Sequence, residues 1–129
     1  MDFSLPRKDI IRSKKEIETL LAKGEVLFRY PIKAYWLRDT GAGASRMMVS
    51  VPKRNFKRAV KRNRLKRLVR EAFRLNRNML GSAEYDFLFV YLGKEICDYG
   101  TVESKIREIL RLSLGKAEKS SELAPDIAG

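Results

Sequence analysis

The stretch KRAVKRNRLKRLVREAFRLNR, residues 57–77, carries two patterns at once. Ten lysines and arginines stand in it against a single acid, Glu71. Apolar or neutral side chains recur on one side at about 100° per residue: Leu65, Leu68, Val69, Ala72, Phe73, Asn76 and, just beyond, Met79 and Leu80. The spacing predicts one long helix, closed by Gly81 and Ser82, with an apolar side for a core and a cationic side opposite.

Shorter elements flank this helix on both sides. Before it, Ser13 begins a capping-box pattern for a helix that stops at Gly24, and residues 31–39 and 46–51 read as two strands joined by a Gly-rich loop. After it, residues 85–92 are nearly all apolar, as in a central strand covered on both faces, and residues 101–114 have helical spacing. This order predicts an α+β, two-layer sandwich in which a small mixed sheet packs with about three helices.

The chain has the size of one ordinary domain, with 129 residues of which 44% are hydrophobic. Residues 115–129 are rich in small and polar types without a sustained period. We therefore expect a single domain over residues 1–114 and a flexible C-terminal tail over 115–129.

The net charge of +12 is concentrated in one place. Residues 53–77 hold twelve lysines or arginines and one acid, a local net of +11, so the rest of the chain nets to +1. A localised cationic stripe is the footprint of a polyanion site, with nucleic acid as the leading partner and an anionic membrane as a distant second. Arginine, which matches phosphate with a planar fork, outnumbers lysine seven to three in residues 57–77.

Several classes of protein are disfavoured by what the sequence lacks. It has no histidine and only one cysteine, Cys97, so we predict no disulfide framework and no cysteine–histidine metal cluster, and we assign no residue to a metal. No nucleophile–base pair or carboxylate cluster stands out, and we expect no catalytic residue in the chain. The sequence has no run of about 18 apolar residues and no signal-peptide pattern, which favours a soluble, cytoplasmic protein away from membranes.

The segment SVPKRNFKRAVKRNRLKRLVREAFR, residues 50–74, resembles the signature of the protein subunit of bacterial ribonuclease P. The resemblance centres on Arg62-Asn63-Arg64, Lys66-Arg67 and Arg70-Glu71. It implies an α/β sandwich with an unusual left-handed βαβ crossover. It also implies a non-catalytic component of an endoribonuclease, whose catalytic RNA removes the 5′ leader of precursor tRNA with Mg²⁺ bound mainly by RNA and substrate.

The resemblance also assigns residues to two surfaces. By position, the resemblance implies that the catalytic RNA is faced by Arg62, Asn63, Arg64, Lys66, Arg67 and Arg70. From the charge pattern we expect the same RNA surface to include Lys53, Arg54, Lys57, Arg58, Lys61 and Arg74. The family's cleft for the leader corresponds to Ile17, Leu21, Lys33 and Tyr35. Ile17 and Leu21 stand where the family has phenylalanines, and Leu92 where it commonly has an arginine, so Phe28, Tyr30 or Lys94 are candidates to compensate.

Other functions stay open on the residues alone. A ribosomal protein or an RNA chaperone would use the same basic helix, but its affinity would not depend on the length of a leader. A DNA-binding helix is a further alternative, although no second helix joined by a tight turn is evident. A stand-alone protein nuclease is the least favoured, since it lacks catalytic residues.

Overall fold

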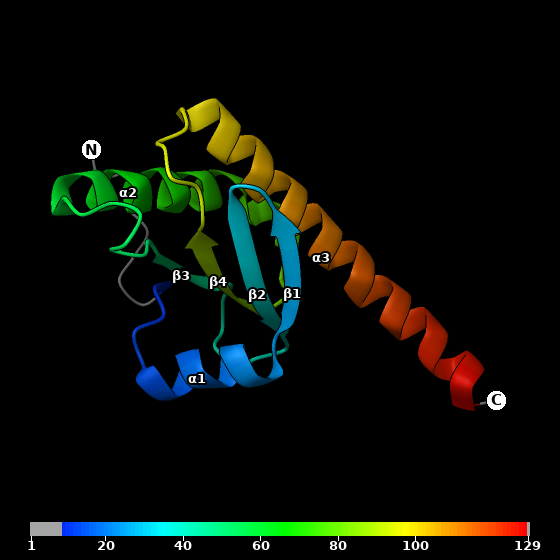
Figure 1. Cartoon of the computed structure of the whole chain (residues 1–129). Coiled ribbons are helices and arrows are strands. Elements are labelled where there is room, and N and C mark those ends of the chain that lie inside the picture. The colour runs from blue at the N-terminus through cyan, green and yellow to red at the C-terminus, as the bar shows by residue number, and fades with distance from the viewer. Residues whose placement is uncertain (1–8, 129) are drawn as a thin grey trace.

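A computed structural model of the chain describes the backbone of residues 9–128 and the side chains of residues 9–116. In chain order the elements are helix α1 (Lys14–Lys23), strands β1 (Glu25–Arg29), β2 (Ile32–Arg38) and β3 (Arg46–Ser50), helix α2 (Ala59–Asn76), the 3-10 turn η2 (Arg77–Leu80), strand β4 (Tyr85–Tyr91) and helix α3 (Tyr99–Ala128). In Figure 1, α1 lies on one side of the sheet, and α2 and α3 lie on the other.

The four strands form one mixed sheet in the order β1-β2-β4-β3. β2 pairs antiparallel with both β1 and β4, whereas β3 pairs in parallel with β4. Two parallel neighbouring strands cannot be joined by a tight turn, so helix α2 belongs to the crossover connection that leads from β3 to β4. This confirms the predicted α+β class with a βαβ unit; the left hand of the crossover stays a prediction.

The core lies between the sheet and helices α2 and α3. β4 is the central strand, with six of its seven residues buried, as its apolar composition predicted. The predicted apolar side of α2 is confirmed at its centre, where Leu65, Val69 and Phe73 are fully buried. Phe73 packs against Phe87 and Phe89, each with ring centroids 6.0 Å apart. The core therefore fixes which side of α2 faces outward.

A smaller apolar cluster holds α1 on the opposite face of the sheet. Leu20 of α1 and Leu88 of β4 are buried in it together with Ile11. Ser13 caps α1 as predicted, accepting a hydrogen bond from the Glu16 backbone N–H at 3.3 Å. Residues just before α1 are tied to the edge strand β3, because the Ile11 N–H donates to the Met47 carbonyl at 2.9 Å.

The structure adds a strand that the hydrophobic pattern did not indicate. β1 buries only Leu27, while Val26 and Phe28 are about half exposed. An edge strand with one buried position has no apolar alternation to detect. Its pairing with β2 forms a hairpin that closes through the turn at Tyr30 and Pro31.

Helix α3 differs from its prediction at both ends. It starts at Tyr99 rather than Thr101, and Asp98 caps it by accepting from the Thr101 N–H at 2.8 Å. Its backbone stays helical to Ala128, through the residues that the sequence analysis expects to form a flexible tail. Backbone hydrogen bonds can continue through Ala-, Glu- and Lys-rich sequence without an apolar period. That residues 115–129 are flexible and lie outside the domain stays a prediction.

Candidate nucleic-acid interface

Helix α2 presents its cations on the side that points away from the core. Asn63, Arg64 and Arg67 are exposed, and Lys66 and Arg70 are half-buried beside them. Lys53, Arg54, Lys57, Arg58 and Lys61 are exposed in the preceding loop and the first turn. The structure therefore leaves most of the predicted RNA-binding residues accessible in the N-terminal half of α2 and the loop before it.

Ion pairs with acids are confined to the C-terminal end of this helix. Arg74 pairs with Glu71, and Arg77 donates to Asp9 at 2.7 Å. Between residues 53 and 70, no lysine or arginine pairs with an acid of the described part of the chain. The N-terminal half of α2 and the loop before it are thus left with uncompensated positive charge, where an external anion is favoured.

Arg62 is placed differently from its cationic neighbours. Its Nη1 donates to the backbone oxygens of Phe56 at 2.7 Å and Lys57 at 2.9 Å. Arg58, the N-cap residue of α2, makes no side-chain capping bond. Arg62 therefore fixes the loop that leads into the helix, a role that the repeating basic pattern did not reveal.

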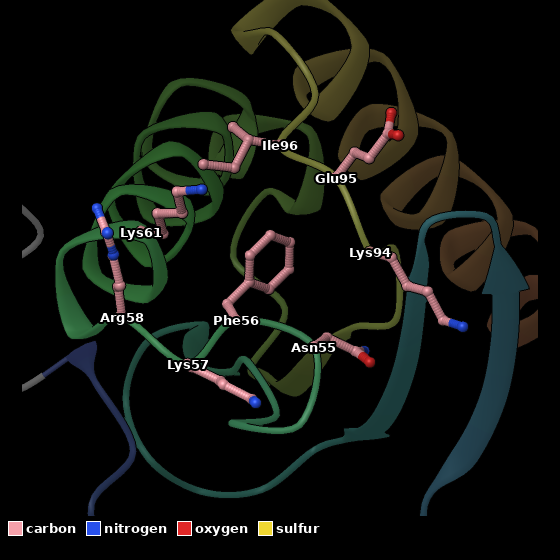
Figure 2. A pocket seen from close by; sticks show the side chains of 8 residues that line it. All are labelled: Asn55, Phe56, Lys57, Arg58, Lys61, Lys94, Glu95 and Ile96. Carbon is pink, nitrogen blue, oxygen red and sulfur yellow. The ribbon is translucent and has the colours of Figure 1, made fainter.

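A basic pocket of about 430 Å³ opens where this loop meets the connection between β4 and α3. Figure 2 shows Arg58 at the N-cap of α2, Lys61 in the first turn, Lys94 and Glu95 on the connection, and the Phe56 ring between them. Lys57 completes a set of four cations against one acid among the lining residues. Lys94, distant in sequence from the basic segment, extends the cationic surface beyond α2.

The residues predicted for the leader lie on the other face of the sheet. Ile17 and Tyr35 are half-buried against the α1 cluster, and Leu21 is 50% exposed. Lys33 projects over the Tyr35 ring, with Nζ 5.1 Å from the ring centroid. A cation beside a partly exposed aromatic ring is a combination that single-stranded nucleic acid binding uses.

The β1–β2 hairpin adds aromatic surface to this face. Phe28 pairs in register with Lys33, so the two side chains share a face of the sheet. Phe28 is 51% exposed, and its ring meets that of Tyr30 edge to face with centroids 6.4 Å apart. The sequence has no aromatic residue at positions 17 and 21, but the fold places Phe28 of β1 on the same face of the sheet.

Two acids near the α1 face, Asp86 and Glu16, are held by one arginine. Arg46 donates to Asp86 at 3.0 Å and 2.7 Å and also contacts Glu16. The hydrogen bonds that Arg46 donates to Asp86 are the largest of several causes that raise the pKa of Arg46 above its ordinary value. Among residues 9–116, no three histidine, cysteine, aspartate or glutamate side chains gather as metal ligands would.

These features define a basic α+β protein with a surface of cations, unpaired within the described residues, around the N-terminal half of α2. Comparison with known proteins agrees, since the ribonuclease P family model matches residues 5–115. The ribonuclease P protein component of Porphyromonas gingivalis is 34% identical over 127 residues, covering 92% of this chain and 93% of the relative. That of Borrelia hermsii is 38% identical over 101 residues, covering 78% of this chain and 87% of the relative.

Solved structures give the same result for the fold. The RNase P protein of Thermotoga maritima has a TM-score of 0.68 at 26% identity, covering 78% of this chain and 93% of that one. The Staphylococcus aureus RNase P protein, at 18% identity, has a TM-score of 0.70 and covers 81% and 94%. The chain belongs to the ribonuclease P protein family, and it acts in tRNA processing as the protein component of that ribonucleoprotein.

Proposed function

We propose that this chain is the non-catalytic subunit of ribonuclease P and that it binds the catalytic RNA through the exposed side of α2. The observation that carries the proposal is the row of cations from Lys53 to Arg70 without acidic partners in the described chain. Ten like-charged pairs three or four residues apart lie between residues 57 and 77. In an isolated helix they would cost roughly 2–5 kcal/mol, a cost that a bound polyanion removes.

The face around α1 and the β1–β2 hairpin would bind the 5′ leader of precursor tRNA. Tyr35 and Phe28 would offer ring faces for bases, and Lys33, on the same strand as Tyr35 and opposite Phe28 in register, would meet the RNA backbone. Stacking of a base on an aromatic side chain is worth about 1–3 kcal/mol and tolerates any base. This surface would therefore recognise a single strand without strict sequence preference.

Magnesium, in this proposal, is held mainly by the RNA and the substrate. The acids of the described chain do not form a ligand set, and Asp86 and Glu16 are already bound by Arg46. The metal would supply the activated nucleophile for cleavage. The chain's own residues would position the two RNAs and lower the repulsion between them.

The proposal includes a cytoplasmic location and a single RNA-binding domain over residues 1–114. No helix within residues 9–128 combines the length and the apolar character that a membrane span requires. Precursor tRNA and the catalytic RNA are the proposed partners.

The decisive experiment is reconstitution with a bacterial ribonuclease P RNA at low Mg²⁺, with and without the protein. We expect the protein to stimulate leader removal and to be inactive without the RNA. The Arg67→Ala variant should bind the RNA more weakly and with a smaller salt dependence, by about one released counterion. Absence of stimulation by the wild-type chain would refute the proposal.

A further inference from the structure

A second cationic cavity, of about 320 Å³, lies between α2, β3 and the residues that lead into α1. Its lining consists of Ile10, Ile11, Arg12, Ile17, Met48, Val49, Lys66 and Arg70. Three of these eight residues are cationic and none is acidic. The cavity therefore combines an apolar floor with a rim of positive charge.

Arg70 has a buried hydrogen-bond donor without an acceptor. Its Nε is buried and has no partner in the structure. Burial, followed by the charge of Arg12, lowers the pKa of Arg70 from its ordinary value. A buried donor without an acceptor is costly, and two guanidinium groups held near each other add to that cost. Both costs would vanish if an anion occupied the cavity.

Arg12 is held in place by its neighbours, although its side chain is exposed. Ile11 is 2% exposed and bonds to the Met47 carbonyl at 2.9 Å, while Asp9 accepts from Arg77 at the end of α2. Ser13 then starts α1. Because the residues on both sides of Arg12 are fixed, its backbone loses little further conformational entropy when its side chain binds a ligand in the cavity.

We propose that Arg12, Lys66 and Arg70 together bind one phosphate group of an RNA backbone. Two planar forks and one ammonium group match the oxygens of a phosphate, and Arg70, which lines the cavity, has a buried Nε donor without a partner. The site extends the RNA surface of α2 to the segment before α1, toward the face proposed for the leader. The RNA as the source of the phosphate rests on the proposed function.

Phosphate binding by this site can be tested with the full chain in the absence of RNA. Inorganic phosphate should raise the Tm of the wild-type protein more than chloride does at equal ionic strength. Arg12→Gln should weaken the apparent phosphate affinity about tenfold, as expected for one charge-assisted contact. Arg111→Gln, the same charge change at an exposed position of α3, is the matched control and should stay near the wild type. Equal phosphate affinity in both variants would overturn the proposal.

Two binding measurements identify the source of the phosphate. If it belongs to the catalytic RNA, Arg12→Gln weakens assembly of the protein with ribonuclease P RNA about tenfold. If it belongs to the precursor, assembly is unchanged and the assembled enzyme loses affinity for precursor tRNA. If Arg12→Gln weakens neither the assembly nor the binding of precursor tRNA, the proposal that this site binds an RNA phosphate is overturned. If the wild-type chain does not bind ribonuclease P RNA, the proposed function is refuted. The phosphate titration tests the phosphate site independently of that result.

Discussion

Arg62 donates a hydrogen bond to the backbone oxygen of Phe56 at 2.7 Å, so the first arginine of the Arg-Asn-Arg motif holds the protein itself. The same guanidinium also reaches the Lys57 oxygen at 2.9 Å. Its neighbour Arg64 is exposed and makes no ion pair within the described chain. Two arginines in one motif thus have different surroundings.

This difference predicts different effects on stability. Arg62→Ala should lower the free energy of unfolding by about 1–2 kcal/mol, because hydrogen bonds from a charged donor are lost. Arg64→Ala should change it by less than about 0.5 kcal/mol and act only on RNA binding. Urea unfolding of both variants without RNA makes the comparison. Equal stability of the two variants would contradict a structural role for Arg62.

Tyr35→Ala should weaken binding of precursor tRNA about tenfold through loss of one stacked base. Binding of mature tRNA, which lacks the leader, should not change. The measurement is the affinity of the reconstituted enzyme for each RNA. Equal losses for both would remove Tyr35 from the leader surface.

Phe28→Ala should reduce precursor affinity only when the leader is long enough to reach the β1–β2 hairpin. A series of precursors with increasing leader length tests this, because the wild type and the variant should diverge beyond a certain length. Leu75→Ala, which shortens an equally exposed apolar side chain on α2, is the control. A loss that is the same at every leader length would exclude contact with Phe28.

Arg46→Met should destabilise the fold by about 3–5 kcal/mol, because it leaves the buried carboxylate of Asp86 without its cation. The double variant with Asp86→Leu should recover most of this loss, since the unpaired charge is gone. Thermal unfolding of the single and double variants measures the coupling. No recovery in the double variant would show that Arg46 acts through packing instead.

Glu103 links α3 to α2 and should make part of the stability dependent on pH. Hydrogen bonds from Arg107, then from Asn76, lower the pKa of Glu103 below its ordinary 4.5. A lowered folded pKa gives stability that is present above 4.5 and is lost as the pH falls through the folded value. Glu103→Gln should therefore have a lower Tm than the wild type near neutral pH, and the gap should close in acid. A constant gap would refute the linkage.

The sequence predicted elements whose residues face a core on a regular period. α2 and β4 are of this kind, because burial of Leu65, Val69 and Phe73 or of nearly every β4 residue leaves a periodic or continuous apolar pattern. β1 escaped detection because Leu27 is its only buried residue. The pairing order of the strands also lies beyond a periodicity argument, since it is set by contacts between distant segments.

For the candidate site, the composition predicted the cationic surface but not the direction of each side chain. Arg62 turns back to the loop, and Arg70 reaches a cavity formed with Arg12. The segment that carries Arg12 reaches that place only because it bridges to β3, a contact between Ile10 and Met47. A helical repeat in the sequence cannot predict this placement of Arg12, because it depends on contacts between segments that are distant in the chain.

The bridge between Ile10 and Met47 also bears on self-association. β3 is the outermost strand on its side of the sheet, and an open strand edge invites pairing with other chains. The Ile11 N–H already uses the Met47 carbonyl, so part of that edge is occupied. At the opposite edge, the short strand β1 carries charges at both ends, Glu25 and Arg29. Both margins of the sheet thus resist aggregation before the protein meets its RNA.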